Sequence, residues 1–136
     1  MVTSDQTGTA LEFEGLAVLL VEDNVRLRGM VARTLESMGC AVVAAADAGE
    51  AMNVLQGGGS FDLMLSDIRM PGPMDGVALA EWVAERYPQV AVLLVTGFTH
   101  TANIRFAVLS KPFGLDHLVI AMNQVLGRAG SAGTAS

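Results

Sequence analysis

The chain contains a single cysteine, Cys40, and therefore cannot form an internal disulfide bond. A chain of 136 residues buries enough surface on folding to be stable without disulfides or a structural metal. Cys40 directly precedes the apolar segment 41–45, where a thiol behaves as a small hydrophobic side chain. We therefore interpret Cys40 as a core residue, and we expect the protein in a reducing compartment, the cytoplasm.

Basic residues are also scarce. Lys and Arg number 8 against 14 Asp and Glu, which gives a formal net charge of −6. Proteins that bind nucleic acids gain most of their affinity by neutralising phosphates with a basic surface. The composition therefore argues against direct binding of DNA or RNA.

Long hydrophobic runs are missing. No apolar segment approaches the roughly 18 residues of a membrane-spanning helix, and residues 1–8 lack the basic and apolar regions of a secretory signal. Residues 1–14 are polar and Thr-rich, and residues 128–136 have the Gly, Ala and Ser composition of a flexible tail. We predict one domain over residues 15–127, flanked by two flexible segments and not associated with a membrane.

Within this domain, short apolar runs alternate with longer amphipathic segments. The runs are rich in Val and Leu and do not alternate with polar residues, as is typical of strands buried on both faces of a parallel sheet. Strands are predicted at 16–21, 41–45, 61–65, 90–95 and 106–109, and helices at 25–38, 48–56, 76–87 and 114–126. This order predicts right-handed βαβ units, and hence a doubly wound α/β fold with a five-stranded parallel sheet and helices on both faces.

Two segments stand out in this pattern, the first predicted helix and the fourth connection between strands. The helix at 25–38 has a stripe that we expect to face the core, consisting of Leu27, Met30, Val31, Thr34 and Met38. The fourth connection, between residues 98 and 106, is too short for the usual crossover between parallel strands. We therefore expect it to be short or irregular.

Polar side chains stand at the ends of four of the predicted strands. Asp67 ends one strand region, Glu22 and Asp23 follow another, and Thr96 and Lys111 follow two more. In parallel α/β sheets, ligands bind beyond the carboxyl ends of the strands. We expect these side chains to gather there, with Asp67 facing solvent at the edge of the sheet.

Each of these residues alone has an ordinary explanation. Acids after a strand usually cap helices or face water, a lysine is usually a surface residue, and Thr96 before Gly97 is compatible with a simple turn. Their predicted proximity at one edge of the sheet instead indicates a functional site. Three neighbouring carboxylates repel one another unless a cation neutralises them, and hard oxygen ligands suit Mg²⁺.

An ionised aspartate, a divalent cation, an ammonium and a hydroxyl make a site for phosphoryl transfer. Catalysis of this reaction depends mostly on positioning and charge neutralisation. Asp67 needs no general base because an aspartate is already ionised at neutral pH. The product is an acyl phosphate on the aspartate.

The order and spacing of these motifs resemble those of response-regulator receiver domains, the CheY-like superfamily. The resemblance covers about residues 15–127 and is carried by four motifs: Val-Leu-Leu-Val-Glu22-Asp23-Asn, Asp67-Ile-Arg-Met-Pro-Gly, Thr96-Gly and Lys111-Pro112-Phe113. It implies a flavodoxin-like (βα)5 fold.

The resemblance also implies roles for the acidic residues. Asp67 corresponds to the phosphoacceptor, and Glu22 and Asp23 correspond to the pair that binds Mg²⁺. The backbone carbonyl of Arg69 is the further metal ligand that it implies.

Thr96 corresponds to the switch hydroxyl of receivers, and Lys111 to the lysine that contacts the phosphoryl group. The Lys111–Pro112 peptide bond should be cis. One departure concerns the switch: Val108 occupies the position where receivers usually carry Tyr or Phe, and the nearest aromatic residue, Phe106, lies on the same strand face. The shortened fourth crossover resembles a receiver subgroup found in hybrid kinases and short stand-alone regulators.

We therefore predict a stand-alone response regulator of a two-component phosphorelay. A histidine kinase or a histidine phosphotransfer protein would phosphorylate Asp67, and the altered surface would signal to an unidentified protein. The chain would not be an enzyme beyond Mg²⁺-dependent self-phosphorylation and slow self-dephosphorylation. Ile120 and Ala121 widen the apolar stripe of the last helix, which leaves homodimerisation open.

The sequence leaves two alternative functions open. A phosphohydrolase of the haloacid-dehalogenase type would form the same aspartyl phosphate, but it requires an aspartate where this chain has Arg69. A receiver-like binding module that is never phosphorylated would commonly lack one of the acids or the lysine, and this chain retains them all.

Overall fold

The computed structural model describes residues 12–97 and 103–128. Within these ranges the strands are β1 (Ala17–Val21), β2 (Ala41–Ala45), β3 (Leu63–Asp67), β4 (Ala91–Thr96) and β5 (Ala107–Ser110). The helices are α2 (Val25–Ser37), α3 (Ala48–Gln56), α4 (Gly76–Arg86) and α5 (Leu115–Leu126). None of these helices is long and apolar enough to cross a membrane.

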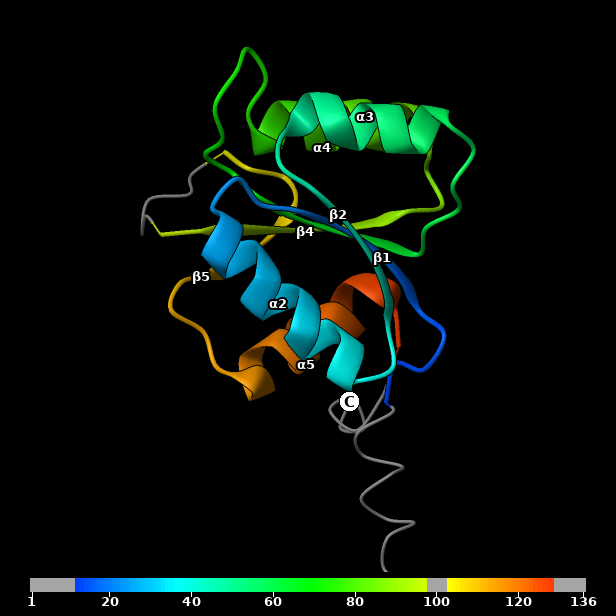
Figure 1. The fold of residues 1–136 in the computed structure, drawn as a ribbon, viewed down its shortest axis with the longest axis vertical. Coiled ribbons are helices and arrows are strands. Elements are labelled where there is room, and N and C mark those ends of the chain that lie inside the picture. Colours follow the sequence, from blue (N-terminus) through cyan, green and yellow to red (C-terminus); the bar gives the residue numbers. More distant parts are fainter. Residues whose placement is uncertain (1–11, 98–102, 129–136) are drawn as a thin grey trace, which may run out of the picture.

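The strands form one parallel sheet in the order β2-β1-β3-β4-β5. Helices α3 and α4 cover one face of this sheet, and α2 and α5 cover the other (Figure 1). The fold class predicted from the sequence, a doubly wound flavodoxin-like α/β fold, is confirmed. The strand order reverses between β1 and β3, and a crevice at such a reversal is where ligands bind in open α/β sheets.

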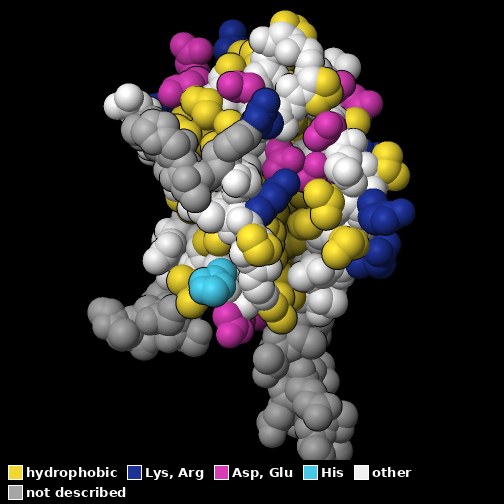
Figure 2. Space-filling view, turned by 90° about the vertical axis from the view of Figure 1, so that its left-hand side faces the viewer, with side chains coloured by type: hydrophobic (Ala, Val, Ile, Leu, Met, Phe, Trp, Pro, Cys, Tyr) yellow, Lys and Arg dark blue, Asp and Glu magenta, His cyan; other side chains and the backbone are white. Residues whose placement is uncertain are grey.

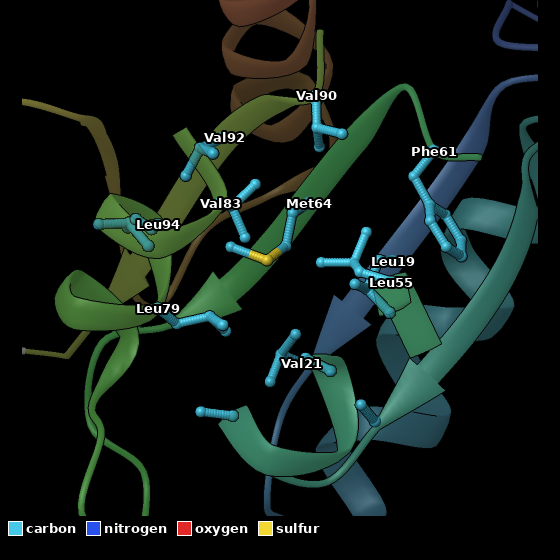
Figure 3. Close-up of a cluster of buried hydrophobic side chains, with 14 residues drawn as sticks. Leu19, Val21, Leu55, Phe61, Met64, Leu79, Val83, Val90, Val92 and Leu94 are labelled. Carbon is cyan, nitrogen blue, oxygen red and sulfur yellow. The ribbon is translucent and has the colours of Figure 1, made fainter. Parts of the chain in front are cut away.

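Two hydrophobic layers fill the space between the sheet and its helices. Successive side chains of β1 alternate between them: Leu19 and Val21 join the layer under α3 and α4, and Val18 and Leu20 join the layer under α2 and α5. The first layer, shown in Figure 3, includes Met64 of β3. Because both faces of each central strand are buried, the strands are apolar at every position rather than at alternate ones.

The helix starts are fixed by side-chain caps. Asn24 Oδ1 accepts a hydrogen bond from the Leu27 amide of α2 at 3.0 Å, and Asp75 caps α4 in the same way. At α3 the cap is reciprocal, because Asp47 accepts from the Glu50 amide while the Glu50 carboxylate accepts from the amide of Ala46. The Asn24 cap begins α2 directly after Glu22 and Asp23, two of the functional candidates.

One strand begins two residues later than the apolar run at 61–65 that predicted it. The third strand runs from Leu63 to Asp67, so Asp67 ends it as expected. Asp62 explains the shift, because its side chain accepts a hydrogen bond from the Ala17 amide and its own amide donates to the Ala17 carbonyl, both at 2.8 Å. Phe61 is buried against the core but precedes the strand. The other elements begin and end within one residue of the prediction.

The predicted core stripe of the first helix was also partly wrong. Leu27 and Met30 are 36% and 50% exposed, whereas Leu35, which lay outside the predicted stripe, is fully buried. The periodicity identified a helix but not its rotation. Helix α2 packs mainly on β2 and β1, so the face that carries Leu35 turns toward the sheet.

Cys40 has the role expected from the sequence. Its side chain is 6% exposed and belongs to the layer under α2 and α5. Burial raises the pKa of its thiol to about 11, so Cys40 is protonated at neutral pH. It is a packing residue rather than a reactive thiol.

The core also uses a residue from the segment predicted to be a flexible lead-in. Phe13 is fully buried, and its amide donates a hydrogen bond to the Met38 carbonyl at 3.0 Å. The Arg128 guanidinium lies 5.4 Å from the centre of the Phe13 ring. The packed part of the chain therefore begins at least as early as Phe13 and includes a contact with Arg128.

The short fourth connection falls partly outside the described residues, which exclude 98–102. In its described part, Ile104 and Phe106 pack against the layer under α3 and α4. Arg105 forms an ion pair with Glu81 of α4 at 2.6 Å. This contact joins the start of β5 to α4.

Candidate functional site

The residues singled out in the sequence lie at the carboxyl ends of four adjacent strands. Glu22 and Asp23 directly follow β1, and Asp67 and Thr96 are the last residues of β3 and β4. Lys111 directly follows β5. The parallel register aligns these strand ends, because Asp67 is opposite Val95 and Thr96 is opposite Ser110. The site therefore lies at the reversal point of the sheet.

Three carboxylates form the centre of the site. Glu22, Asp23 and Asp67 each offer an oxygen within 4.8 Å of the other two. Asp23 is exposed, whereas Glu22 and Asp67 are 6% and 8% exposed. The expectation that Asp67 faces solvent was therefore wrong. As the last residue of a central strand, Asp67 is enclosed by the strand ends on both sides.

Lys111 provides the positive charge next to these acids. Its Nζ atom lies 2.9 Å from Asp67 Oδ1 and 3.7 Å from Glu22 Oε1. The Lys111 amide donates a hydrogen bond to the Thr96 carbonyl at 2.8 Å, which fixes the backbone that carries the ammonium. The Lys111–Pro112 peptide bond is cis, as the resemblance implied.

Burial, hydrogen bonds and charge together shift the pKa values of Glu22 and Lys111. Partial burial acts to lower the pKa of Lys111, but the hydrogen bond and charge of Asp67, together with Glu22, outweigh burial and raise it. Burial also raises the pKa of Glu22 from 4.5 to about 7, and the neighbouring Asp67 carboxylate adds to the shift. Glu22 is therefore harder to ionise than an exposed glutamate when no metal ion is bound beside it.

This donor set fits a magnesium ion. The three residues offer hard carboxylate oxygens within 4.8 Å of one another, the ligand type that Mg²⁺ prefers. A bound Mg²⁺ would neutralise charge on the carboxylates and on an incoming phosphoryl group. Glu22, Asp23 and Asp67 are the residues that would hold it.

The remaining two candidates lie at the border of the cluster. Thr96 is 4% exposed at the end of β4, the strand next to β3. Arg69 is exposed and lies two residues after Asp67, where the chain leaves β3. Ile68 lies between Asp67 and Arg69, and its amide donates a hydrogen bond to the Val95 carbonyl at 3.0 Å. This bond holds the chain against β4 where it leaves β3.

Comparison with known families agrees with this architecture. The family described as the response regulator receiver domain matches residues 18–123, which include every residue of the site. The chain belongs to this family. Receiver domains are signalling domains of two-component systems rather than enzymes in their own right.

Similar curated proteins are longer than this receiver. The chain is 33% identical over 126 residues to the sensor kinase CckA of Brucella abortus (strain 2308), covering 86% of this chain and 13% of that protein. It is 36% identical over 94 residues to the regulator of RpoS of Escherichia coli (strain K12), covering 69% of this chain and 27% of that protein. The receiver therefore spans a small part of the relatives that it matches.

Solved structures share the fold. A response regulator receiver protein from Sinorhizobium medicae WSM419 superimposes with a TM-score of 0.74 at 28% identity, covering 84% of this chain and 96% of that one. The response regulator TrrA from Thermotoga maritima, in complex with Mg²⁺-BeF, gives a TM-score of 0.74 at 23% identity, covering 81% and 98% of the two chains. At that identity the TrrA structure supports the fold alone.

Sequence reasoning missed Arg28 as a residue of this receiver's site. Its Nη1 atom donates hydrogen bonds to the carbonyls of Glu22 at 3.0 Å and Asp23 at 3.4 Å. Arg28 therefore holds the backbone of both acids from the first turn of α2. The sequence signal was the position of Arg28, five and six residues after Asp23 and Glu22. A long side chain in the first turn of a helix can reach back to the loop that precedes it.

Replacing Arg28 with glutamine should weaken Mg²⁺ binding about fivefold, or about 1 kcal/mol, because the two carbonyls lose their common donor. Calorimetric titration with Mg²⁺ measures this change, and far-UV circular dichroism should stay the same. Arg28→Lys should recover part of the affinity, since an ammonium can donate to one of the carbonyls. Unchanged affinity in Arg28→Gln would show that the loop holds its shape without the guanidinium.

The aromatic position of the receiver switch remains unusual. Val108 and Phe106 both pack against the layer under α3 and α4, so they share a strand face as expected. The Arg105 guanidinium lies 4.4 Å from the centre of the Phe106 ring, and the same guanidinium pairs with Glu81. Arg105 therefore lies over the Phe106 ring while its ion pair with Glu81 ties it to α4.

Proposed function

We propose that this receiver accepts a phosphoryl group on Asp67 and signals through protein contacts. The observation that carries the proposal is the Lys111 ammonium 2.9 Å from Asp67 Oδ1, inside a group of three carboxylates able to hold a cation. The Lys111 ammonium orients the Asp67 carboxylate, and it can form an ion pair with a phosphoryl oxygen once transfer begins. This combination is more specific than the fold alone.

In the proposed reaction, an ionised Asp67 oxygen attacks the phosphorus of the donor, and the bond from phosphorus to the leaving group breaks. Lys111 contacts a transferred phosphoryl oxygen, and the Thr96 hydroxyl donates a hydrogen bond to another. Glu22 and Asp23, with the backbone carbonyl of Arg69, complete the proposed Mg²⁺ ligands. No proton has to leave Asp67, because its carboxylate is the nucleophile.

The curated relatives support the proposed partner class. CckA and TorS are named as a sensor kinase and a sensor protein, and the regulator of RpoS as a regulator. We propose a histidine kinase or a histidine phosphotransfer protein as the donor, in the cytoplasm. That this receiver acts alone and that its downstream partner is a protein stay predictions, as does the assignment of residues 15–127 to the domain.

Incubation with Mg²⁺ and acetyl phosphate should add one phosphoryl group to the protein, detected as a mass increase and mapped to Asp67 by peptide mass spectrometry. Asp67→Asn should remain unlabelled, because an amide is not a nucleophile at this pH. The exposed Asp116 of α5 provides a matched control, and Asp116→Asn should label like the wild type. Equal labelling of the wild type and Asp67→Asn would exclude Asp67 as the acceptor.

A further inference from the structure

The outer face of α4 carries a group of aromatic and charged side chains. Trp82 is half-buried, its ring centre lies 5.7 Å from that of Tyr87, and the Arg86 guanidinium lies 5.0 Å from the centre of the Trp82 ring. The ion pair between Glu81 and Arg105 borders this group. Tryptophan, tyrosine and arginine are the residues most enriched at the energetic centres of protein interfaces. The outer face of α4 therefore has the composition of an interface.

These side chains are held in place by the receiver itself. The Trp82 ring packs against the layer under α3 and α4, and the Arg86 guanidinium lies over it. Arg105 donates hydrogen bonds from Nε and Nη2 to the Glu81 carboxylate. Side chains that are already fixed lose less rotamer freedom on association, so more of their contact energy appears as affinity.

The charge of this surface fits a second copy of the same chain. A two-fold axis brings each surface against itself, so an excess of one sign on that surface causes repulsion. Glu81 and Glu85 are balanced here by Arg86 and Arg105, although the chain as a whole has a formal net charge of −6. The outer face of α4 and the start of β5 are therefore electrically neutral together.

The other helices lack this balance. Helix α2 has three arginines and one glutamate, and Figure 2 shows basic side chains gathered at one side of the face displayed, over α2. Helix α3 has one glutamate and α5 has one aspartate, and neither contains a lysine or an arginine. Pairing any of these helices with its own copy would bring like charges together.

We propose that the outer face of α4 is a dimer interface, in which two copies pack their α4 helices antiparallel about a two-fold axis. An axis midway between residues 83 and 84 places Glu81 of one copy opposite Arg86 of the other, because the two residues are equally distant from it. Symmetry repeats this contact. Trp82 lies next to the axis, where contacts are most fully removed from water. The inference does not depend on phosphorylation of Asp67.

Sedimentation equilibrium without a phosphodonor, from micromolar to millimolar protein, tests the inference. The wild type should dimerise reversibly, and Trp82→Gln should raise the dissociation constant at least about tenfold, because a central tryptophan is truncated. Ile120→Gln is the matched control, since Ile120 is a 42% exposed apolar residue on α5, and it should keep the wild-type constant. A wild type that stays monomeric, or a dimer weakened by Ile120→Gln and not by Trp82→Gln, would overturn the inference.

Charge reversal gives a test that leaves Trp82 in place. Arg86→Glu and Glu81→Lys should each raise the dissociation constant at least about tenfold, because like charges then meet at both symmetry-related contacts. An equimolar mixture of the two variants should regain an affinity close to that of the wild type, since both contacts of the mixed dimer again join opposite charges. Glu81→Lys also loses the ion pair with Arg105, so far-UV circular dichroism checks that each variant is folded. A mixture that associates no more tightly than either variant alone would contradict the proposed packing of α4.

Discussion

Replacing Gly76 with alanine should destabilise the protein by about 2–3 kcal/mol and slow phosphorylation of Asp67. The Gly76 amide donates a hydrogen bond to the Ile68 carbonyl at 2.7 Å, which brings the start of α4 against the end of β3. A Cβ atom at Gly76 would overlap the carbonyl oxygen of Asp67 and lie 2.7 Å from the Ile68 Cα atom. Backbone atoms cannot rotate away, so Asp67, the proposed phosphoacceptor, has to move.

Gly49 provides the matched control, because it lies in the first turn of α3. A Cβ atom at Gly49 would lie 3.4 Å from the Asp47 side chain, an ordinary contact. Gly49→Ala should be neutral or stabilising by up to about 1 kcal/mol, the usual gain from removing a helical glycine. Urea denaturation measures both variants. If Gly76→Ala is as stable as Gly49→Ala, the close approach does not constrain the site.

Replacing Glu22 with glutamine should have two large effects of opposite sign. Without metal at pH 8, the free energy of unfolding should rise by about 2 kcal/mol, because the variant no longer holds a buried carboxylate beside Asp67. Affinity for Mg²⁺ should fall at least about tenfold, because a charged ligand is lost. Excess Mg²⁺ should therefore stabilise the wild type much more than the variant.

The sign of the first effect follows from the pKa of Glu22. Its value in the folded protein, about 7, lies above the ordinary 4.5, so the folded state holds this proton more tightly than the unfolded state. The resulting stabilisation is complete below about pH 4.5 and is lost as the pH rises through about 7. The advantage of Glu22→Gln in the absence of metal should therefore grow between pH 5 and 8.

Thermal and urea denaturation in EDTA across this pH range test the prediction. Glu36→Gln is the control, because Glu36 is an exposed acid on α2 outside the carboxylate cluster. A difference between Glu22→Gln and the wild type that does not change with pH would mean that burial and Asp67 do not raise the pKa of Glu22. The carboxylate cluster would then need no cation.

Much of this fold was predictable because its signals are local. The Val- and Leu-rich strands are apolar at consecutive positions since both faces of the sheet are covered, and Asn24, Asp47 and Asp75 mark the helix starts through their caps. The start of the third strand was placed two residues early because Phe61 is as apolar as the strand itself. Its exclusion depends on the hydrogen bonds of Asp62 to Ala17, a residue distant in sequence.

The sequence predicted which residues gather at the site, but not how deeply they are buried or how their pKa values shift. Parallel strands place Asp67 and Lys111 at one edge of the sheet, and this follows from the order of the elements. That Asp67 is enclosed, and that Glu22 has a raised pKa, depends on which strands are neighbours and how closely their ends approach. Arg28 was missed for the same reason, because its hydrogen bonds go to a loop whose path is set by α2.

The sequence by itself determined the alternation of strands and helices, the residues at the strand ends and their resemblance to receivers, because these depend on local patterns. Only the tertiary structure decided the rotation of α2, which leaves Leu27 and Met30 facing a groove instead of the core. A helical stripe states which side chains share a face, but not which neighbour that face meets. The packing of α2 on β1 and β2 sets which face of the helix is buried, and it leaves Leu27 and Met30 lining a groove beside Asp67.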